Sequence, residues 1–385
     1  MNSPFLYGTA VTGEHFTNRT EEILRLRNNF LNGRNTVIIS PRRIGKTSLV
    51  KYAAELYMDN PDRDKIQFCF IDLYKARDAE DFYKIFVTSI IKSTSSKLDE
   101  WLQNVRSFLG KLVPKISLGS DPQSEFSLSF DYINSEMDFD EVFDLPEKLA
   151  EKYSLKLIIC LDEFQNLEYF KESLLFQKRA RAAWQHHKKT SYIIYGSKMH
   201  MMGNLFQEQS MPFYRFGDML FLERIENKSL NNYVVNAFYR TGKNISSEIT
   251  ESMVNLMEAH PYYVQQMADI LWNRTKTNVN EDLLNEALEI FLKQNNPFFQ
   301  GIIENLTNSQ LSFINALISG EKHFTSAEVL HKYKLGSSAN IKRIKEALIK
   351  KNIITIAPRG IVFEEPAIRI LFTRYFDNAD LFKQL

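Results

Sequence analysis

The stretch SPRRIGKTSL, residues 40–49, carries the side chains with the clearest chemistry in this chain. It nearly fits the pattern G-x-x-x-x-G-K-[ST], in which backbone N–H groups surround a phosphate. In such a loop Lys46 would reach the β- and γ-phosphates of a nucleotide, and Thr47 would ligate Mg²⁺. The predicted phosphate loop therefore consists of Ser40, Pro41, Arg42, Arg43, Ile44, Gly45, Lys46, Thr47 and Ser48.

One position departs from the pattern, because Ser40 replaces the first glycine. That glycine serves the tight turn out of a strand, and a serine can be accommodated there at some strain. Gly45, beside the lysine, is kept at the position where a side chain would block the phosphate. The plain alternative is that the letters GKT merely open a helix.

Further polar residues follow two apolar stretches. LKLIICLDEFQNL (155–167) brings Asp162 and Glu163 to the end of a strand. Asp162 would hold the Mg²⁺ shell, and Glu163 would polarise an attacking water. SYIIYG (191–196) is followed by Ser197, which could touch the γ-phosphate or that water. Read separately, the two motifs could also be an exposed acidic pair and a polar strand end.

The elements that position these residues follow from periodicity. Apolar strand patterns at 36–40, 65–76, 155–162, 191–196 and 218–225 alternate with helical patterns. This alternation predicts an α/β fold with a parallel five-stranded sheet wound with helices. Ligands of such sheets bind at the carboxyl ends of the strands, where Ser40, Asp162 and Ser197 are all expected.

Composition restricts the class of protein. A chain of 385 residues is expected to form two or three domains. The net charge of +1 suggests neither a nucleic-acid nor a membrane binder as a whole. Cys69 and Cys160 lie in apolar runs and are predicted to be reduced core residues. Without a signal-like N-terminus or a long apolar run, a cytoplasmic protein with no membrane contact is expected.

The core is predicted over residues 1–225, and it contains an insertion between its second and third strands. Residues 77–155 begin with helical patterns and become strongly acidic from Asp121 to Glu147. Within them, apolar and polar residues alternate in FSLSFDYI, as expected for a short hairpin or an edge strand. The insertion is interpreted as a solvated segment in preference to a partner site. Residues 226–300 then carry only helical patterns and predict an all-α lid domain.

Residues 301–385 predict a winged helix-turn-helix, with three helices followed by two strands around Pro358-Arg359-Gly360. Residues 331–351 hold seven Lys or Arg and one Glu. Lys342, Arg343, Lys345 and Arg359 could therefore meet the phosphates of duplex DNA. The alternatives are a protein contact, a lid over the nucleotide, or lysines that only keep the helix in solvent.

As a set, these motifs resemble the archaeal-type P-loop ATPase family, which is AAA+-like and related to the STAND ATPases. The resemblance rests on HFTNRTEEILRL, SPRRIGKTSL, CLDEFQNL, YGSKMHMM, MPFYRFGD and EAHPYYVQQMA. It implies that Arg19, His260 and Pro261 contact the nucleotide. It also implies a catalytic role for Arg215. In MPFYRFGD this arginine stands one place earlier than the arginine of the family's Pro-Phe-Tyr-Gly-Arg stretch.

The expected function is an ATP-binding, slowly hydrolysing molecular switch that uses ATP/ADP and Mg²⁺. Its catalytic residues would be Lys46, Glu163, Ser197 and Arg215, and its metal ligands Thr47 and Asp162. Two alternatives remain: an ATPase that binds duplex DNA through the winged helix, and a nucleotide-binding module that does not hydrolyse. A protein partner or a nucleotide-dependent homo-oligomer is also compatible with these motifs.

Overall fold

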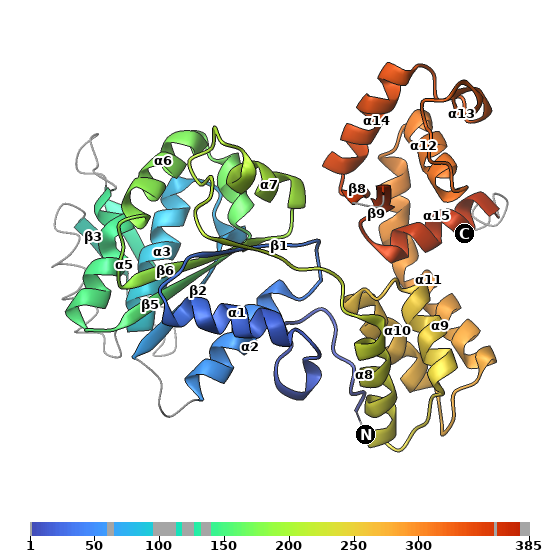
Figure 1. The fold of residues 1–385 in the computed structure, drawn as a ribbon, viewed down its shortest axis with the longest axis horizontal. Coiled ribbons are helices and arrows are strands. Elements are labelled where there is room, and N and C mark those ends of the chain that lie inside the picture. Colours follow the sequence, from blue (N-terminus) through green and yellow to red (C-terminus); the bar gives the residue numbers. More distant parts are fainter. Residues whose placement is uncertain are drawn as a thin grey trace. The chain divides into compact units, whose positions relative to one another are not determined.

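The computed structural model describes residues 2–59, 65–94, 113–117, 127–131, 140–357 and 360–377. The chain forms two compact units, both drawn in Figure 1. The core unit comprises Arg19–Pro41 and Lys46–Glu223, and the helical unit comprises Met1–Asn18, Arg42–Gly45 and Arg224–Leu385. The helical unit thus contains both stretches predicted as lid and winged helix, and the boundaries between those domains stay predictions.

A five-stranded sheet forms the centre of the core unit, with the strand order β2-β5-β6-β1-β7. All its pairings are parallel, as the sequence predicts. The central strands β1, β5 and β6 are almost entirely buried, which is typical of parallel sheets, whereas the edge strands β2 and β7 keep exposed positions. The strands are β1 (Thr36–Ile39), β2 (Ile66–Asp72), β5 (Lys156–Asp162), β6 (Thr190–Gly196) and β7 (Asp218–Phe221).

Two strands, β2 and β7, end four residues earlier than predicted. β2 ends at Asp72 because its carboxylate accepts a hydrogen bond from the Tyr74 N–H at 2.9 Å and starts the turn η2 (Leu73–Lys75). β7 ends at Phe221, although the Leu222 N–H still donates to the Ile39 carbonyl at 3.0 Å.

Helices cover both faces of this sheet. α1 and α2 lie on one face, and α3, α5 and α6 lie on the other (Figure 1). On the second face, Trp184 stacks on Tyr192 with a centroid distance of 4.3 Å inside an aromatic cluster. Cys69 and Cys160 are buried and free, as predicted. The helical elements are α1 (Thr20–Leu31), α2 (Lys46–Met58), α3 (Ala79–Thr94), α5 (Asp140–Lys152), η3 (Phe164–Tyr169), α6 (Ser173–Trp184) and α7 (Met199–Gln207).

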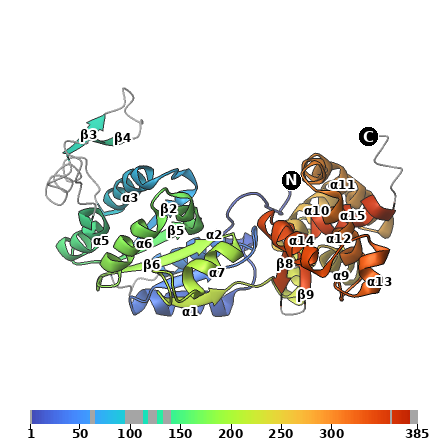
Figure 2. The same ribbon diagram turned by 90° about the horizontal axis from the view of Figure 1, so that it is seen from above.

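The insertion contains a short antiparallel pair, β3 (Val113–Ser117) and β4 (Ser127–Asp131). Figure 2 shows it as a pair of strands separate from the main sheet. Residues 127–131 of the alternating stretch FSLSFDYI therefore form one strand of an antiparallel pair. Much of the acidic segment, residues 118–126 and 132–139, lies outside the described residues.

The helical unit is held together by one continuous apolar core. Several of its helices begin at a side-chain cap, including a capping box between Thr307 and Gln310. Of the helices in the described ranges, none is long and apolar enough to cross a membrane. The elements are α8 (Asn227–Arg240), α9 (Ser247–Leu256), α10 (Pro261–Arg274), α11 (Glu281–Glu304), α12 (Asn308–Ile318), α13 (Ala327–Lys332), α14 (Ser338–Lys350), β8 (Ile354–Ala357), β9 (Gly360–Phe363) and α15 (Pro366–Asp377).

The last part of this unit has the element order that the winged-helix prediction requires. Three helices, α12, α13 and α14, precede the antiparallel strands β8 and β9. The name winged helix stays a prediction. Arg359, one of the proposed DNA contacts, lies outside the described residues.

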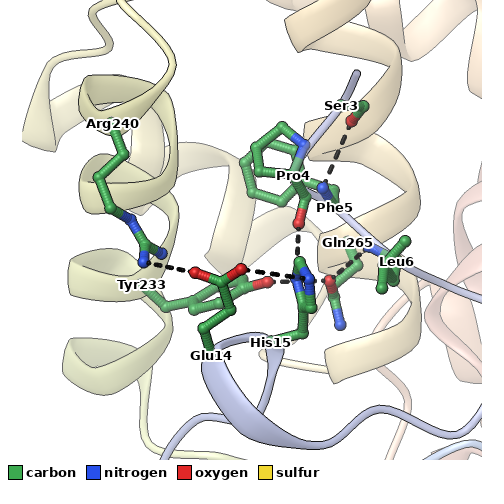
Figure 3. Close-up of polar contacts among 9 residues, drawn as sticks. All are labelled: Ser3, Pro4, Phe5, Leu6, Glu14, His15, Tyr233, Arg240 and Gln265. Atoms are coloured by element: carbon green, nitrogen blue, oxygen red, sulfur yellow. Dashed lines mark hydrogen bonds and ion pairs between the residues drawn. The ribbon is translucent and has the colours of Figure 1, made fainter. Parts of the chain in front are cut away.

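The N-terminal segment packs on α8 and α10 of the same unit (Figure 3). Phe5 is 3% exposed, and its ring lies 6.2 Å from that of Tyr233 and 5.4 Å from that of Phe238. The Leu6 N–H and the Tyr233 hydroxyl both donate to Gln265 Oε1, at 3.0 and 3.2 Å. The N-terminal segment, which precedes the core unit in the sequence, therefore packs into the apolar interior of the helical unit.

Replacing Phe5 with alanine is expected to destabilise the helical unit by about 3 kcal/mol, because it removes a buried ring. The control is Leu6→Ala, since Leu6 is 40% exposed and an exposed side chain should cost less than about 0.5 kcal/mol. Urea denaturation followed by circular dichroism measures both. Equal losses for the two variants would contradict the anchoring role of Phe5.

Candidate nucleotide site

The predicted phosphate loop connects β1 to α2. β1 ends at Ile39, and α2 begins at Lys46, so the loop opens directly into a helix N-terminus. Gly45 has φ +99°, a conformation that side chains rarely adopt, whereas a Cβ placed on it would meet no atom within 4 Å. The structural requirement for glycine at this position is thus its backbone conformation, and the predicted clash with phosphate stays a prediction.

Lys46 folds back onto the start of its own loop. It is 6% exposed, and its Nζ donates to Ser40 O at 3.2 Å, Ser40 Oγ at 3.1 Å and Pro41 O at 2.9 Å. A buried ammonium needs such acceptors to offset the cost of its desolvation. The lysine ammonium is therefore held beside the first two residues of the loop, Ser40 and Pro41, by their oxygens.

Thr47 and Asp162, the two predicted metal ligands, are in direct contact. Thr47 Oγ1 donates to Asp162 Oδ2 at 2.7 Å, and Asp162 Oδ1 accepts from the Glu163 N–H at 2.8 Å. Burial raises the pKa of Asp162 to about 6, and the charge of Glu163 acts in the same direction, while the Thr47 bond opposes it. A cation placed between these oxygens would favour the ionised carboxylate.

Glu163 leaves the strand with a left-handed backbone, φ 54°. Its Oε2 accepts hydrogen bonds from Gln165 Nε2 and, at 3.1 Å, from Ser197 Oγ. The residues that follow β5 and β6 are thus in contact through Glu163 and Ser197, and the predicted contact of Ser197 with phosphate or water stays a prediction. Gln165 is a polar contact that the sequence did not single out, and it is fully buried.

Gly196, the last residue of β6, makes room for Gln165. A Cβ on Gly196 would lie 1.9 Å from Gln165 Oε1 and 2.8 Å from Met202 Sδ. A side chain at Gly196 would therefore push Gln165 away from Glu163.

Gly196→Ala is expected to destabilise the core unit by about 1–3 kcal/mol, because the new methyl overlaps a buried amide. Gly203→Ala in α7 is the matched control, since its Cβ would meet Gln207 Oε1 at 3.6 Å, an ordinary contact. A helical alanine there should leave stability unchanged or slightly higher. Urea unfolding midpoints test the pair, and identical midpoints for the two variants would contradict the packing described for Gln165.

Arg19 is buried at the start of α1, where Asn18 and Arg19 both have positive φ. Its guanidinium bonds to Glu22 Oε1 at 3.0 Å and to the carbonyl of Glu223, the last residue of the core unit. Burial lowers the pKa of Arg19, and the bond to Glu22 opposes this shift. These contacts fasten the two points where the chain enters and leaves the core unit, and the predicted nucleotide contact of Arg19 stays a prediction.

Residues Arg42–Gly45 group with the helical unit. Within that unit Arg43 Nη1 donates to Tyr263 Oη at 3.1 Å and lies 3.4 Å from Glu365 Oε2, and the guanidinium lies 4.4 Å from the Tyr262 ring centre. Arg42 is exposed and Ile44 is buried. Arg43 is thus engaged by protein groups of the helical unit.

His260 and Pro261 begin α10, with Pro261 in the first helical position. His260 is fully buried, and burial lowers its pKa to about 3, so the imidazole is neutral at physiological pH. Glu258 and Ala259 before it both have positive φ, a backbone conformation that favours glycine. Glu258 is held by ion pairs with Arg224 and Arg369.

Arg215 is exposed, and its guanidinium lies 5.2 Å from the Tyr214 ring centre. Its backbone is left-handed, with φ 52°. The predicted catalytic role of Arg215 stays a prediction.

The donor set fits Mg²⁺ with a nucleotide better than a metal held by protein alone. Among the residues described, no group of three or more His, Cys, Asp or Glu could hold a metal ion. Mg²⁺ with nucleotides commonly uses one or two protein oxygens together with phosphates and water. Thr47 and Asp162 supply two such oxygens beside a helix N-terminus, where backbone N–H groups attract phosphate.

Comparison with known proteins supports the fold. The sequence matches no protein-family model and no curated protein. A Walker-type ATPase of Pyrococcus abyssi is similar in structure, with a TM-score of 0.66, 16% identity, and coverage of 94% of this chain and 97% of that one. The ORC2 protein of Aeropyrum pernix, solved as ADPNP and ADP complexes, has a TM-score of 0.57, 12% identity, and coverage of 100% and 96%. The chain therefore has the fold of archaeal Walker-type P-loop ATPases.

Proposed function

We propose that this protein binds ATP with Mg²⁺ at residues 40–48, hydrolyses it slowly and acts as a molecular switch. The observation that carries the proposal is the line of polar contacts at the carboxyl ends of β1, β5 and β6. Thr47 bonds to Asp162, Glu163 follows Asp162 directly, and Ser197 bonds to Glu163. The nucleotide complexes of the similar Aeropyrum protein support the same interpretation.

Each of these side chains has a task in this proposal. Lys46 turns from its own loop to the β- and γ-phosphates, and Thr47 and Asp162 hold the metal. Glu163 orients and polarises the attacking water, while Ser197 and Gln165 fix the position of its carboxylate. Mg²⁺ supplies neutralisation of the phosphate charge when it is bound.

Phosphate release from ATP, measured with Mg²⁺ and with EDTA, tests this function. The proposal predicts slow turnover that needs Mg²⁺, and ADP retained on the protein after turnover, detected by mass spectrometry. Nucleotide binding without any turnover would instead establish the non-hydrolysing module.

A second candidate, binding of duplex DNA, rests on the basic face of α14. Lys342 and Arg343 are exposed there. Other positive charges have protein partners: Lys345 Nζ lies 5.4 Å from the Phe324 ring centre, and Lys351 donates to the Asn305 carbonyl. Lys342 itself lies 3.9 Å from Glu346. This face can therefore supply only a few phosphate contacts, so a monomer would bind DNA weakly, and a protein contact remains the competing use of this face.

Changing Lys342, Arg343 and Lys345 together to glutamate is expected to remove duplex binding and to leave ATP turnover intact. Each phosphate contact should contribute ~0.9 log units of affinity per log unit of salt, so the wild type should show a slope of only a few units. Fluorescence anisotropy with labelled duplex at several salt concentrations measures this. No binding by the wild type at low salt, with ATP, ADP or neither, would eliminate the DNA candidate.

Self-assembly also belongs to the proposal. The exposed Arg215 could contact a nucleotide held by a neighbouring copy, so assembly would depend on nucleotide. Light scattering with and without Mg-ATP would detect such a change in mass.

A further inference from the structure

The side chain of Ser40 is engaged with Lys46. Ser40 is 1% exposed. Its Oγ accepts a hydrogen bond from Lys46 Nζ at 3.1 Å and donates one to the Pro41 carbonyl at 3.0 Å. The serine that breaks the phosphate-loop pattern is therefore in direct contact with the residue expected to bind phosphate.

The hydrogen-bond acceptors around the Lys46 ammonium show what the Ser40 hydroxyl contributes. An ammonium group has three N–H donors. In the loop its contacts include three oxygens: the carbonyls of Ser40 and Pro41, and the Ser40 hydroxyl. A glycine at this position would offer the same two carbonyls without the hydroxyl. The serine thus adds an acceptor that the pattern residue lacks.

The backbone does not need glycine here. Ser40 does not adopt a positive φ, unlike Arg43 and Gly45 in the same loop. The strain that a positive φ would impose on a serine is therefore absent at Ser40. The hydroxyl contact with Lys46 is the observed difference that serine makes at this position.

We propose that the Ser40 hydroxyl competes with nucleotide phosphate for Lys46 and thereby lowers the nucleotide affinity of this loop. The inference rests on the function proposed above. Phosphate oxygens reach Lys46 only when it exchanges internal acceptors for them. Removing the Ser40 hydroxyl leaves a buried ammonium with one acceptor fewer in the empty loop, which raises the free energy of that state. The bound state supplies a phosphate oxygen in its place.

Two opposite effects follow from removal of this hydroxyl. Ser40→Ala and Ser40→Gly should bind Mg-ATP and Mg-ADP at least about tenfold more tightly, the lower end of the effect expected for one hydrogen bond to a charged group. The same variants should be less stable than the wild type when empty. A serine with a purely structural role would lower stability without increasing affinity.

The affinity arm of the test is isothermal titration calorimetry of Mg-ATP and Mg-ADP with the wild type, Ser40→Ala and Ser40→Gly. Ser173→Ala is the matched control, because Ser173 accepts a side-chain hydrogen bond from Gln177 at 2.9 Å in α6, outside the loop. Its nucleotide affinity should equal that of the wild type.

The second arm needs no nucleotide. Thermal unfolding of the empty protein is compared for the wild type, Ser40→Ala, Lys46→Ala and the double variant. Ser40→Ala should lower the midpoint in the wild-type background and have a clearly smaller effect when Lys46 is already alanine. Equal shifts in both backgrounds would show that the hydroxyl does not act through Lys46 and would overturn the inference.

The outcomes separate this inference from the proposed function. If the wild type binds nucleotide and the Ser40 variants bind no more tightly, the inference fails and the function stands. If only the Ser40 variants bind, competition by Ser40 is supported and the wild type is not a nucleotide-binding protein. If none of them binds, both fail.

Discussion

Replacing Lys46 with alanine is expected to weaken ATP binding by more than about 100-fold, since hydrogen bonds between charged groups are stronger than those between neutral ones. Lys46 is the first residue of α2, and its Nζ already contacts the carbonyls of Ser40 and Pro41 at the start of the loop. Its charge would face the phosphates where the helix N-terminus adds positive potential. Calorimetry with Mg-ATP measures the effect.

Lys51→Ala is the control for this prediction, because Lys51 is an exposed lysine of the same helix. The change removes one positive charge at a distance from the loop, and the affinity should stay within a few-fold of the wild type. Equal affinity of Lys46→Ala and the wild type would show that the phosphate site has been wrongly assigned. Thermal unfolding of both variants confirms that each is folded.

Glu163→Gln is expected to lower the turnover number for ATP by about 10²–10⁴-fold, the range that a positioned general base contributes. ATP affinity should change little, because Thr47 and Asp162 keep their contact. Glutamine has nearly the same shape and can still bond with Ser197, so the decrease isolates the effect of the carboxylate charge. Phosphate release under saturating ATP measures it.

For Glu163 the control is Glu172→Gln, an exposed carboxylate at the start of α6 whose side chain forms no cap. It should turn over ATP at the wild-type rate. A Glu163→Gln variant with undiminished turnover would exclude Glu163 as the group that activates water.

The core of the fold was predictable because its signals are local and repeated. Each buried strand is a run of apolar residues, and each polar pair, such as Asp162-Glu163, follows such a run directly. Parallel strands bring their carboxyl ends to one edge, so Asp162 was expected near the phosphate loop, and it contacts Thr47, which lies 115 positions away in the sequence.

What escaped prediction depends on side-chain packing between distant segments. Gln165 looks like any polar residue after a strand, and only the missing Cβ of Gly196 lets its amide reach Glu163. Arg19 was assigned to the nucleotide by resemblance, whereas its observed partners include a carbonyl 204 positions away. The sequence analysis considered Ser40 only as a substitute for the first glycine of the pattern. Its hydrogen bond with Lys46 depends on the folded conformation of the loop. No local pattern encodes these contacts.

Equilibrium dialysis of the wild-type protein against labelled ATP with Mg²⁺ tests the central claim most directly. If Lys46, Thr47 and Asp162 form a nucleotide site, bound ATP should saturate at one per chain, and unlabelled ADP should displace it. Lys46→Ala measured in parallel should retain almost none. Equal ATP concentrations on both sides of the membrane, up to about 1 mM, the upper end of usual enzyme KM values, would contradict the account.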